Sequence, residues 1–126
     1  MNLLNDLPGV PSAVGPYSQA VKCGGLLFCS GQIPIVPETG KIEAPDVEGQ
    51  AKQVFSNIRN ALKSQGLGMN SIAKATVFLT TMADFPKVNA IYAEEMQGHR
   101  PARSTVQVSA LPLGAQVEIE VVAELG

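Results

Sequence analysis

The sequence predicts a two-layer α+β domain in which two helices cover one face of a single mixed β-sheet. Two long segments have apolar residues at helical spacing, and the other apolar segments are short, β-branched and bounded by glycine or proline. The expected order is β-β-α-β-α-β-β, with no repeat or linker, so residues 1–126 should form one domain. A chain of 126 residues is long enough to bury a hydrophobic core without disulfides or metals.

The N-terminal part is expected to contain an extended leader followed by a β-hairpin. Residues 1–16 include three prolines, which favour an extended segment lying on the surface. Residues 17–23 and 26–33 are strand-like and are joined by two glycines, the composition of a tight hairpin turn. This turn places Cys23 and Cys29 on different rungs of the ladder. We therefore expect two reduced, partly buried structural thiols rather than a disulfide or a metal site.

The first helix is predicted over residues 47–64, after a loop at 33–46 that is rich in turn-forming residues. Asp46 is the expected N-terminal cap, and Gly66 should end the helix in the left-handed conformation. The apolar residues recur at the spacing of one helical face: Val47, Ala51, Val54, Phe55, Ile58, Ala61 and Leu62.

A strand at 72–80 and a second helix follow. Asp84 is expected to cap this helix, and Pro86 is tolerated in the first turn because an N–H there has no partner. Gly98 and Pro101 should close the helix. Its expected buried stripe consists of Phe85, Val88, Tyr92 and Met96.

Two strands, at 102–108 and 116–124, complete the chain around a turn with the sequence LPLGA. Two helices can cover only one face of the sheet, so the other face is either solvated or covered by a partner subunit. Because only 16% of the residues are charged, we expect the chain to oligomerise. In the last strand, glutamates alternate with the residues expected to face the helices: Val117, Ile119, Val121 and Ala123.

The composition excludes several classes of function. The chain has 9 basic and 11 acidic residues, a net charge of -2, and no basic stripe of the kind that binds nucleic acid. Its single histidine, His99, excludes a metal site that needs two imidazoles, and we expect it to be exposed and inert. The sequence has neither an apolar run of membrane-spanning length nor a basic leader, so we expect a soluble cytoplasmic protein.

Arg103 and two glutamates are the strongest candidates for binding and catalysis. A guanidinium that enters a strand just after Pro101 can bind a carboxylate through two parallel hydrogen bonds. A structural ion pair with Glu118 or Glu120 is the alternative. These glutamates share a strand face about 7 Å apart, where they could divide acid and base roles or form ion pairs at an interface. Arg100 is interpreted as a solvated charge at the helix end.

Three weaker signals lie elsewhere in the chain. Tyr17, in the segment GPYSQ, is either a loop anchor or a ligand. Ser30 precedes Gly31, where the backbone could approach a small ligand closely or form a β-bulge. Asn89 interrupts the apolar stripe of the second helix and must find a hydrogen-bond partner, either in a site or on a strand.

Taken together, four motifs resemble the RidA (YjgF) family. They are GPYSQAV, CSGQIP, DFPKVNAIY and RPARSTVQVSALPLGAQVEIE, and the similarity extends from about Ala13 to Glu124. The resemblance implies a homotrimer with a chorismate-mutase-like fold, a central barrel formed by three sheets, and active sites between subunits. It also implies hydrolysis of reactive enamines and imines, such as 2-aminoacrylate, 2-iminopropanoate and 2-iminobutanoate, to 2-oxo acids and ammonia without a cofactor.

The resemblance also implies a role for each matching residue. Arg103 would bind the substrate carboxylate with help from the backbone of Thr105, Glu118 would position water, and Tyr17 would come from across the subunit interface. The pocket wall would be completed by Ser30, Gly31 and Asn89. Two departures are visible: Thr105 stands where the family often has cysteine, and residues 94–96 read EEM where many members have an aromatic residue.

Other functions remain as alternatives to the deaminase. A protein that senses 2-oxo acids would use Arg103 and Thr105 but would tolerate loss of Glu118. The resemblance also implies two further alternatives: ribonuclease or translation-inhibitor activity, and a chaperone role. The negative net charge weighs against RNA, and a chaperone would need exposed apolar surface.

Overall fold

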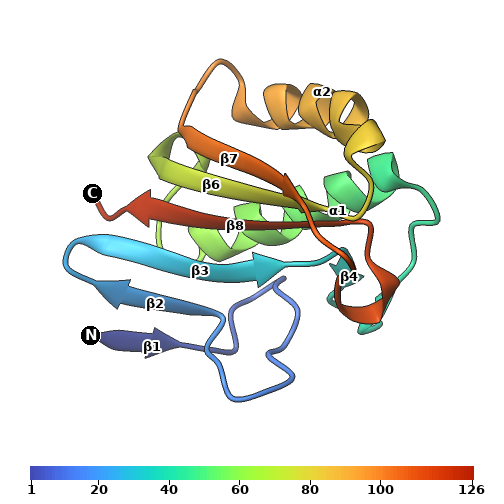
Figure 1. Ribbon diagram of the computed structural model, residues 1–126. Coiled ribbons are helices and arrows are strands. Elements are labelled where there is room, and N and C mark those ends of the chain that lie inside the picture. Colours follow the sequence, from blue (N-terminus) through green and yellow to red (C-terminus); the bar gives the residue numbers. More distant parts are fainter.

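The structure, a computed structural model that describes residues 1–126, contains a six-stranded mixed sheet with two α-helices on one side (Figure 1). The strand order is β1-β2-β3-β8-β6-β7, with β6 and β7 parallel and every other pair antiparallel. This confirms the predicted α+β architecture. The strands are β1 Asn2–Leu4, β2 Ala20–Cys23, β3 Leu26–Gln32, β6 Ile72–Leu79, β7 Ala102–Gln107 and β8 Val117–Glu124.

Helix α1, Val47–Lys63, begins and ends as the sequence predicts. The side chain of Asp46 accepts a hydrogen bond of 2.8 Å from the backbone N–H of Gly49, which satisfies one of the free donors in the first turn. Gly66 adopts a φ of 73°, and the backbone N–H groups of Gly66 and Leu67 bond back into the last turn. The predicted apolar face is buried against the sheet.

Helix α2, Phe85–Met96, has Pro86 in its first turn, but the predicted cap is wrong. Asp84 makes no capping hydrogen bond, because it belongs to a short 3₁₀ turn, Met82–Asp84, and has helical backbone angles. A capping side chain needs an extended backbone to reach the first free N–H groups. The predicted stripe is buried except for Phe85, which is half-buried.

Three short strands were not predicted. β1 lies in the leader and pairs with β2, whereas β4, Ile35–Val36, and β5, Lys41–Ile42, form a small hairpin within the predicted loop. Two- and three-residue strands have no periodicity to detect, and they exist because a partner strand supplies their hydrogen bonds. The leader is largely exposed, as expected, but it is not extended throughout, because a turn closed by the hydrogen bond from the N–H of Val10 to the carbonyl of Leu7 follows β1.

The inner and outer faces of the sheet differ in burial. The inward-facing residues of β8 are at most 2% exposed and pack under α1, as predicted. The outer face carries no helix and leaves the apolar side chains of Leu3, Phe28 and Val106 at least 41% exposed. Apolar exposure of this kind is typical of a surface that binds another protein.

Both cysteines are free, as predicted, but their environments differ. Cys29 is buried in the core, and burial raises the pKa of its thiol to about 11, so the unreactive thiol form predominates at neutral pH. Cys23 lies at the exposed hairpin tip rather than being partly buried, because its side chain projects from the last rung before the turn.

No helix of the structure is both long and apolar enough to cross a membrane.

Candidate active site

The sheet places the two main candidate side chains on opposite faces. Arg103 lies beside Ala75, whose side chain is in the core under the helices, whereas Glu118 lies beside Phe78 on the outer face. Successive residues of a strand point to opposite faces, so this register keeps the two groups apart. The alternative in which Arg103 pairs with Glu118 or Glu120 within the chain is therefore wrong.

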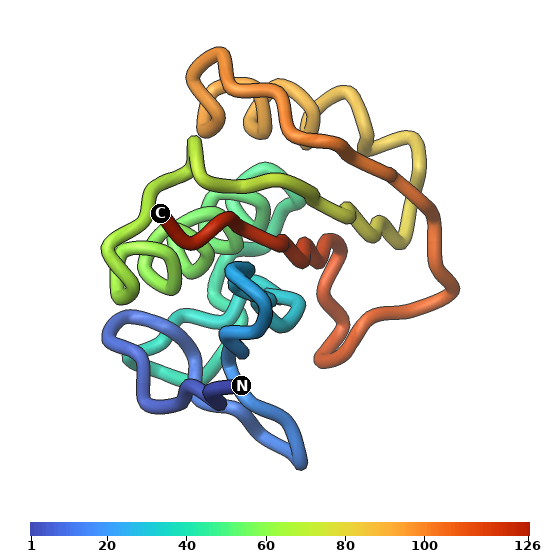
Figure 2. The backbone as a smooth tube through the Cα atoms, turned by 90° about the vertical axis from the view of Figure 1, so that its left-hand side faces the viewer, coloured from blue at the N-terminus to red at the C-terminus, as the bar shows by residue number.

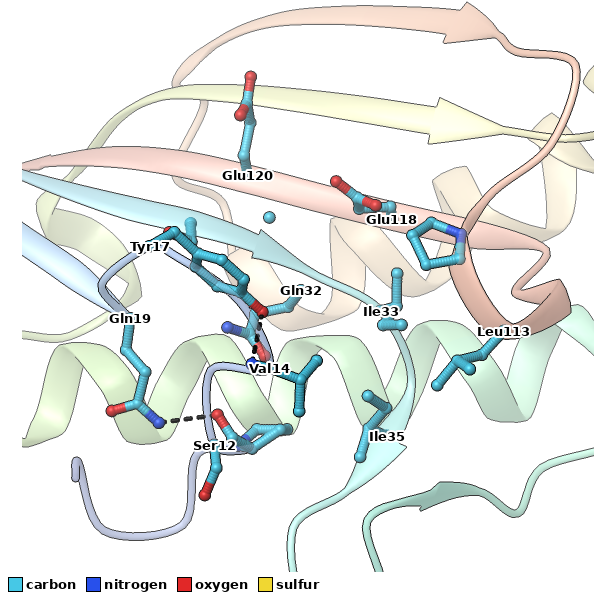
Figure 3. A pocket seen from close by; sticks show the side chains of 14 residues that line it. Ser12, Val14, Tyr17, Gln19, Gln32, Ile33, Ile35, Leu113, Glu118 and Glu120 are labelled. Atoms are coloured by element: carbon cyan, nitrogen blue, oxygen red, sulfur yellow. Dashed lines mark hydrogen bonds between the residues drawn. The ribbon is translucent and has the colours of Figure 1, made fainter. Parts of the chain in front are cut away.

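The outer-face group, which we call the carboxylate half, surrounds a cavity of about 600 Å³ (Figure 3). It combines the ends of β3 and β8 with the leader and with the turn that precedes β8. The structure thus brings together five predicted residues that are far apart in the sequence: Tyr17, Ser30, Gly31, Glu118 and Glu120.

A β-bulge shapes this cavity at Ser30 and Gly31. The pairing of β3 with β8 shifts by one residue between Cys29 and Gln32, which re-aims the chain next to the glutamates. The Ser30 hydroxyl donates a 2.6 Å hydrogen bond to the carbonyl of Ser18, which ties β3 to the segment between the leader and β2. A Cβ atom at Gly31 would overlap Oε2 of Glu118 and lie 2.9 Å from its Cδ, so the missing side chain makes room for the carboxylate.

The Glu118 carboxyl is held in an unusual environment. Its pKa is raised above the ordinary glutamate value, first because burial disfavours the charged form and second because Glu120 repels it. A carboxylate with a raised pKa is a better proton acceptor at neutral pH.

Two buried amides that sequence reasoning missed hold the cavity walls. Gln19 is 4% exposed; its side chain accepts a 2.8 Å hydrogen bond from the N–H of Leu7 and donates one of 2.7 Å to the carbonyl of Pro11. Asn57, on α1, is fully buried and donates a 2.9 Å bond to the carbonyl of Ile35. The sequence signal that could have revealed them is a polar residue within an apolar pattern. A buried amide must form hydrogen bonds, so such a residue has a structural role.

The second group, which we call the arginine half, is built by α2 and β7. The Arg103 side chain donates a 2.7 Å hydrogen bond through Nη1 to Oδ1 of Asn89. Its guanidinium carbon lies 4.7 Å from the ring centroid of Tyr92 and 5.3 Å from that of Phe85. These three partners recur at helical spacing, so one face of α2 orients the guanidinium. Both rings were predicted only as core residues.

Thr105 lies two residues beyond Arg103 on β7 and lines neither cavity. Its side-chain hydroxyl is buried and has no hydrogen-bond partner. Because β7 is at the edge of the sheet, one side of its backbone has no strand partner and can bind another molecule.

His99 and Arg100 also belong to the arginine half, whose cavity has a volume of about 450 Å³. His99 is half-buried rather than exposed, because its Nε2 forms a 2.7 Å hydrogen bond with the carbonyl of Ile72 at the start of β6. Arg100 is exposed, as predicted, but it lines the same cavity as Arg103.

The two halves lie on opposite faces of the sheet: the arginine half is at the β7 edge, and the carboxylate half is on the central strands β3 and β8. Figure 2 shows the leader, which walls the carboxylate half, at the far end of the molecule from α2, which builds the arginine half. No group of three or more histidine, cysteine, aspartate or glutamate side chains is arranged to hold a metal ion.

Comparison with known proteins gives consistent matches. The family model described as Endoribonuclease L-PSP matches residues 9–125. Reactive Intermediate Deaminase A, chloroplastic, from Arabidopsis thaliana is 49% identical over 115 residues, which are 91% of this chain and 62% of that protein. The 2-iminobutanoate/2-iminopropanoate deaminase of Mus musculus is 44% identical over 116 residues, 92% of this chain and 86% of that protein. A crystal structure of E. coli TdcF with bound serine matches with a TM-score of 0.91 at 39% identity, covering 100% of both chains.

Proposed function

Because the chain belongs to the Endoribonuclease L-PSP family, the RidA (YjgF) family that its motifs resemble, we propose that it hydrolyses reactive enamines and imines to 2-oxo acids and ammonia. Its substrates are 2-aminoacrylate, the tautomer 2-iminopropanoate, and 2-iminobutanoate, and the reaction uses no cofactor. One observation carries this proposal: an arginine oriented to bind a carboxylate and a glutamate of raised pKa lie in two half-sites.

The enzyme acts as a cytoplasmic homotrimer in which each subunit is one domain, residues 1–126. In this assembly the arginine half of one subunit faces the carboxylate half of the next. Two observations support the assembly. Arg103 and Glu118 lie on opposite faces of the sheet, so a site that needs both requires two chains. The outer face exposes apolar side chains, including Phe28 and Val106, that a partner subunit would bury.

Arg103 binds the substrate carboxylate through two parallel hydrogen bonds. Asn89 and the aromatic rings of α2 already hold the guanidinium in place, so little rotational freedom is lost on binding. The backbone of Thr105, on the exposed edge of β7, supplies a further hydrogen bond. The carboxylate is thereby fixed relative to the adjacent C=N carbon.

Glu118 orients a water molecule towards that carbon and accepts its proton as the C–O bond forms. The electron pair of the C=N bond moves to nitrogen, which takes up a proton from solvent, and the product is a carbinolamine. Glu118 then returns its proton to the amine, and the C–N bond breaks as the carbinolamine hydroxyl gives its proton to the Glu118 carboxylate. Ammonia leaves, the 2-oxo group forms, and Glu118 releases this last proton to solvent. Tyr17, Ser30 and Gly31 wall the space in which water and substrate meet.

The assay for this proposal generates the imine in situ with an amino-acid oxidase and traps it with semicarbazide, so that trap product is followed by absorbance. The protein should lower the yield of trap product in proportion to its concentration. If the yield stays the same while a 2-oxo acid still binds, the function is sensing rather than hydrolysis. If RNA binds instead, with steep salt dependence, the deaminase assignment fails.

Mixing two inactive variants tests the shared site. Arg103→Ala and Glu118→Gln subunits, unfolded together and refolded at equal concentration, should regain about a quarter of wild-type activity, because one interface in four then has both native residues. Activity is measured by the trapping assay, with separately refolded variants as controls. If no activity is recovered, either both residues act from the same subunit or they have other roles than the proposed ones.

The pH dependence of turnover should report the Glu118–Glu120 pair. Activity requires ionised Glu118, so kcat/KM should fall as the pH is lowered through the raised pKa of this carboxyl. Glu120→Gln removes the repulsion and should move this acid limb to lower pH, although burial keeps the pKa above its ordinary value. The control is Glu124→Gln, an exposed glutamate on the same face of β8. If the acid limb of the Glu120→Gln profile stays in place or moves to higher pH, the assignment of this limb to Glu118 is wrong.

A further inference from the structure

The arginine half contains a second guanidinium that the proposed reaction does not use. Arg100 and Arg103 line one cavity of about 450 Å³. None of the residues that line this cavity is an aspartate or a glutamate, although the chain as a whole carries a net charge of -2. The cavity therefore concentrates positive charge in an otherwise acidic protein, which is typical of an anion-binding site.

Neither arginine is neutralised within the chain. The one ion pair of the structure joins Arg59 to Glu95, outside this cavity. Arg103 donates a hydrogen bond only to the neutral amide of Asn89 and forms no ion pair, so its other N–H groups can bind a carboxylate. Two unpaired guanidinium groups that line one cavity repel each other, and an anion bound between them would offset this repulsion.

One residue that lines this cavity also has a buried hydroxyl without a hydrogen-bond partner. Tyr92 lines the cavity, is only 8% exposed, and its hydroxyl makes no hydrogen bond. Burial raises its pKa, so the hydroxyl keeps its proton and remains a donor. Buried polar groups are normally satisfied, so this unpaired donor in the cavity wall is consistent with a ligand that the single chain lacks.

The spacing of the two arginines suits a ligand with two separate anionic groups. Arg100 precedes Pro101, which favours an extended backbone, and three extended residues separate the two Cα atoms by roughly 10 Å. From this spacing the long side chains can reach the two ends of one small molecule. A substrate with a single carboxylate would occupy Arg103 and leave Arg100 unpaired.

We propose that this site accepts 2-imino dicarboxylates, with Arg103 on the carboxylate next to the C=N bond and Arg100 on the side-chain carboxylate. The inference rests on the proposed deaminase function and extends it to a substrate class. Imines of this class arise from oxidation of acidic amino acids, so an enzyme that oxidises such an amino acid would supply the substrate.

The test compares 2-iminosuccinate with 2-iminopropanoate, generated in situ by D-aspartate oxidase and D-amino-acid oxidase respectively. The measured quantity is the ratio of kcat/KM for the two imines. Arg100→Gln should lower this ratio about tenfold, the effect of losing one charge-assisted hydrogen bond at a partly exposed site. The matched control, Lys87→Gln, removes the same charge from an exposed position on α2 outside the cavity and should leave the ratio unchanged.

The outcomes separate this inference from the proposed function. If the wild type hydrolyses both imines but Arg100→Gln leaves the ratio unchanged, the dicarboxylate inference is overturned and the deaminase stands. An equal fall of the ratio in the Lys87→Gln control would overturn it as well, because general charge attraction would then explain the effect. If neither imine is hydrolysed, calorimetry with oxaloacetate and pyruvate decides. The inference then holds only if oxaloacetate binds more tightly and Arg100→Gln removes the difference.

Discussion

Arg103→Ala should lower kcat/KM for 2-iminopropanoate by about 10²–10⁴. The substitution removes two charge-assisted hydrogen bonds to the substrate carboxylate, each worth about 1.5–3 kcal/mol. It also leaves the C=N carbon free to move relative to the attacking water, so kcat should fall together with substrate affinity. The trapping assay measures the first effect, and calorimetry with 2-oxobutanoate measures the loss of binding.

Two further variants show whether the effect belongs to the guanidinium. Arg59→Ala removes an exposed arginine that pairs with Glu95 between the helices, and it should keep full activity. Arg103→Lys keeps the charge but loses the planar fork and its contacts with Tyr92 and Phe85, so its activity should be intermediate. Size-exclusion chromatography checks that each variant assembles like the wild type. An Arg103→Ala enzyme with normal turnover would refute the carboxylate-binding role.

Glu118→Gln should bind a 2-oxo acid with near wild-type affinity and lower kcat by about 10²–10⁴, the usual contribution of a general base. Glutamine is nearly the same size and still fits against Gly31, but it cannot accept a proton from water. Product-analogue binding separates this effect from damage to the cavity. Normal turnover by the variant would exclude Glu118 from the hydrolytic step and would favour the sensing alternative.

The same variant should be more stable than the wild type at neutral pH. A carboxyl whose pKa is raised in the folded protein costs free energy of folding when it ionises, so stability declines as the pH rises from the unfolded to the folded pKa. Glutamine removes that cost along with the repulsion from Glu120. Thermal unfolding at two pH values measures the gain, which should disappear at a pH below the ordinary glutamate pKa. Glu124→Gln, on the same strand face, is the control and should show no such gain.

Gain of stability and loss of activity in one variant would identify Glu118 as a group kept for function. A carboxylate that is half-buried beside another carboxylate has no structural advantage. The bulge at Ser30 and the glycine at position 31 likewise make room for it rather than improve the ladder.

Local pattern predicted most of the architecture. The helical periodicity of residues 47–64, the cap at Asp46 and the turn at Gly66 are all confirmed, as is the alternation along β8. These features depend on neighbouring residues, whose spacing and capping chemistry can be read directly from the sequence. The motifs likewise placed the chain in its family, because each motif is a contiguous run of residues.

Long-range pairing decided the rest. The short strands β1, β4 and β5 form because partner strands supply their hydrogen bonds. Asp84 loses its predicted role to a 3₁₀ turn that is tied to β7, where the Gln107 side chain accepts a 2.7 Å hydrogen bond from the N–H of Met82. Strand register alone sends Arg103 and Glu118 to opposite faces of the sheet. Both side chains were recognisable in the sequence, but whether they meet within one chain depends on which strands become neighbours, and residues distant in the sequence determine that.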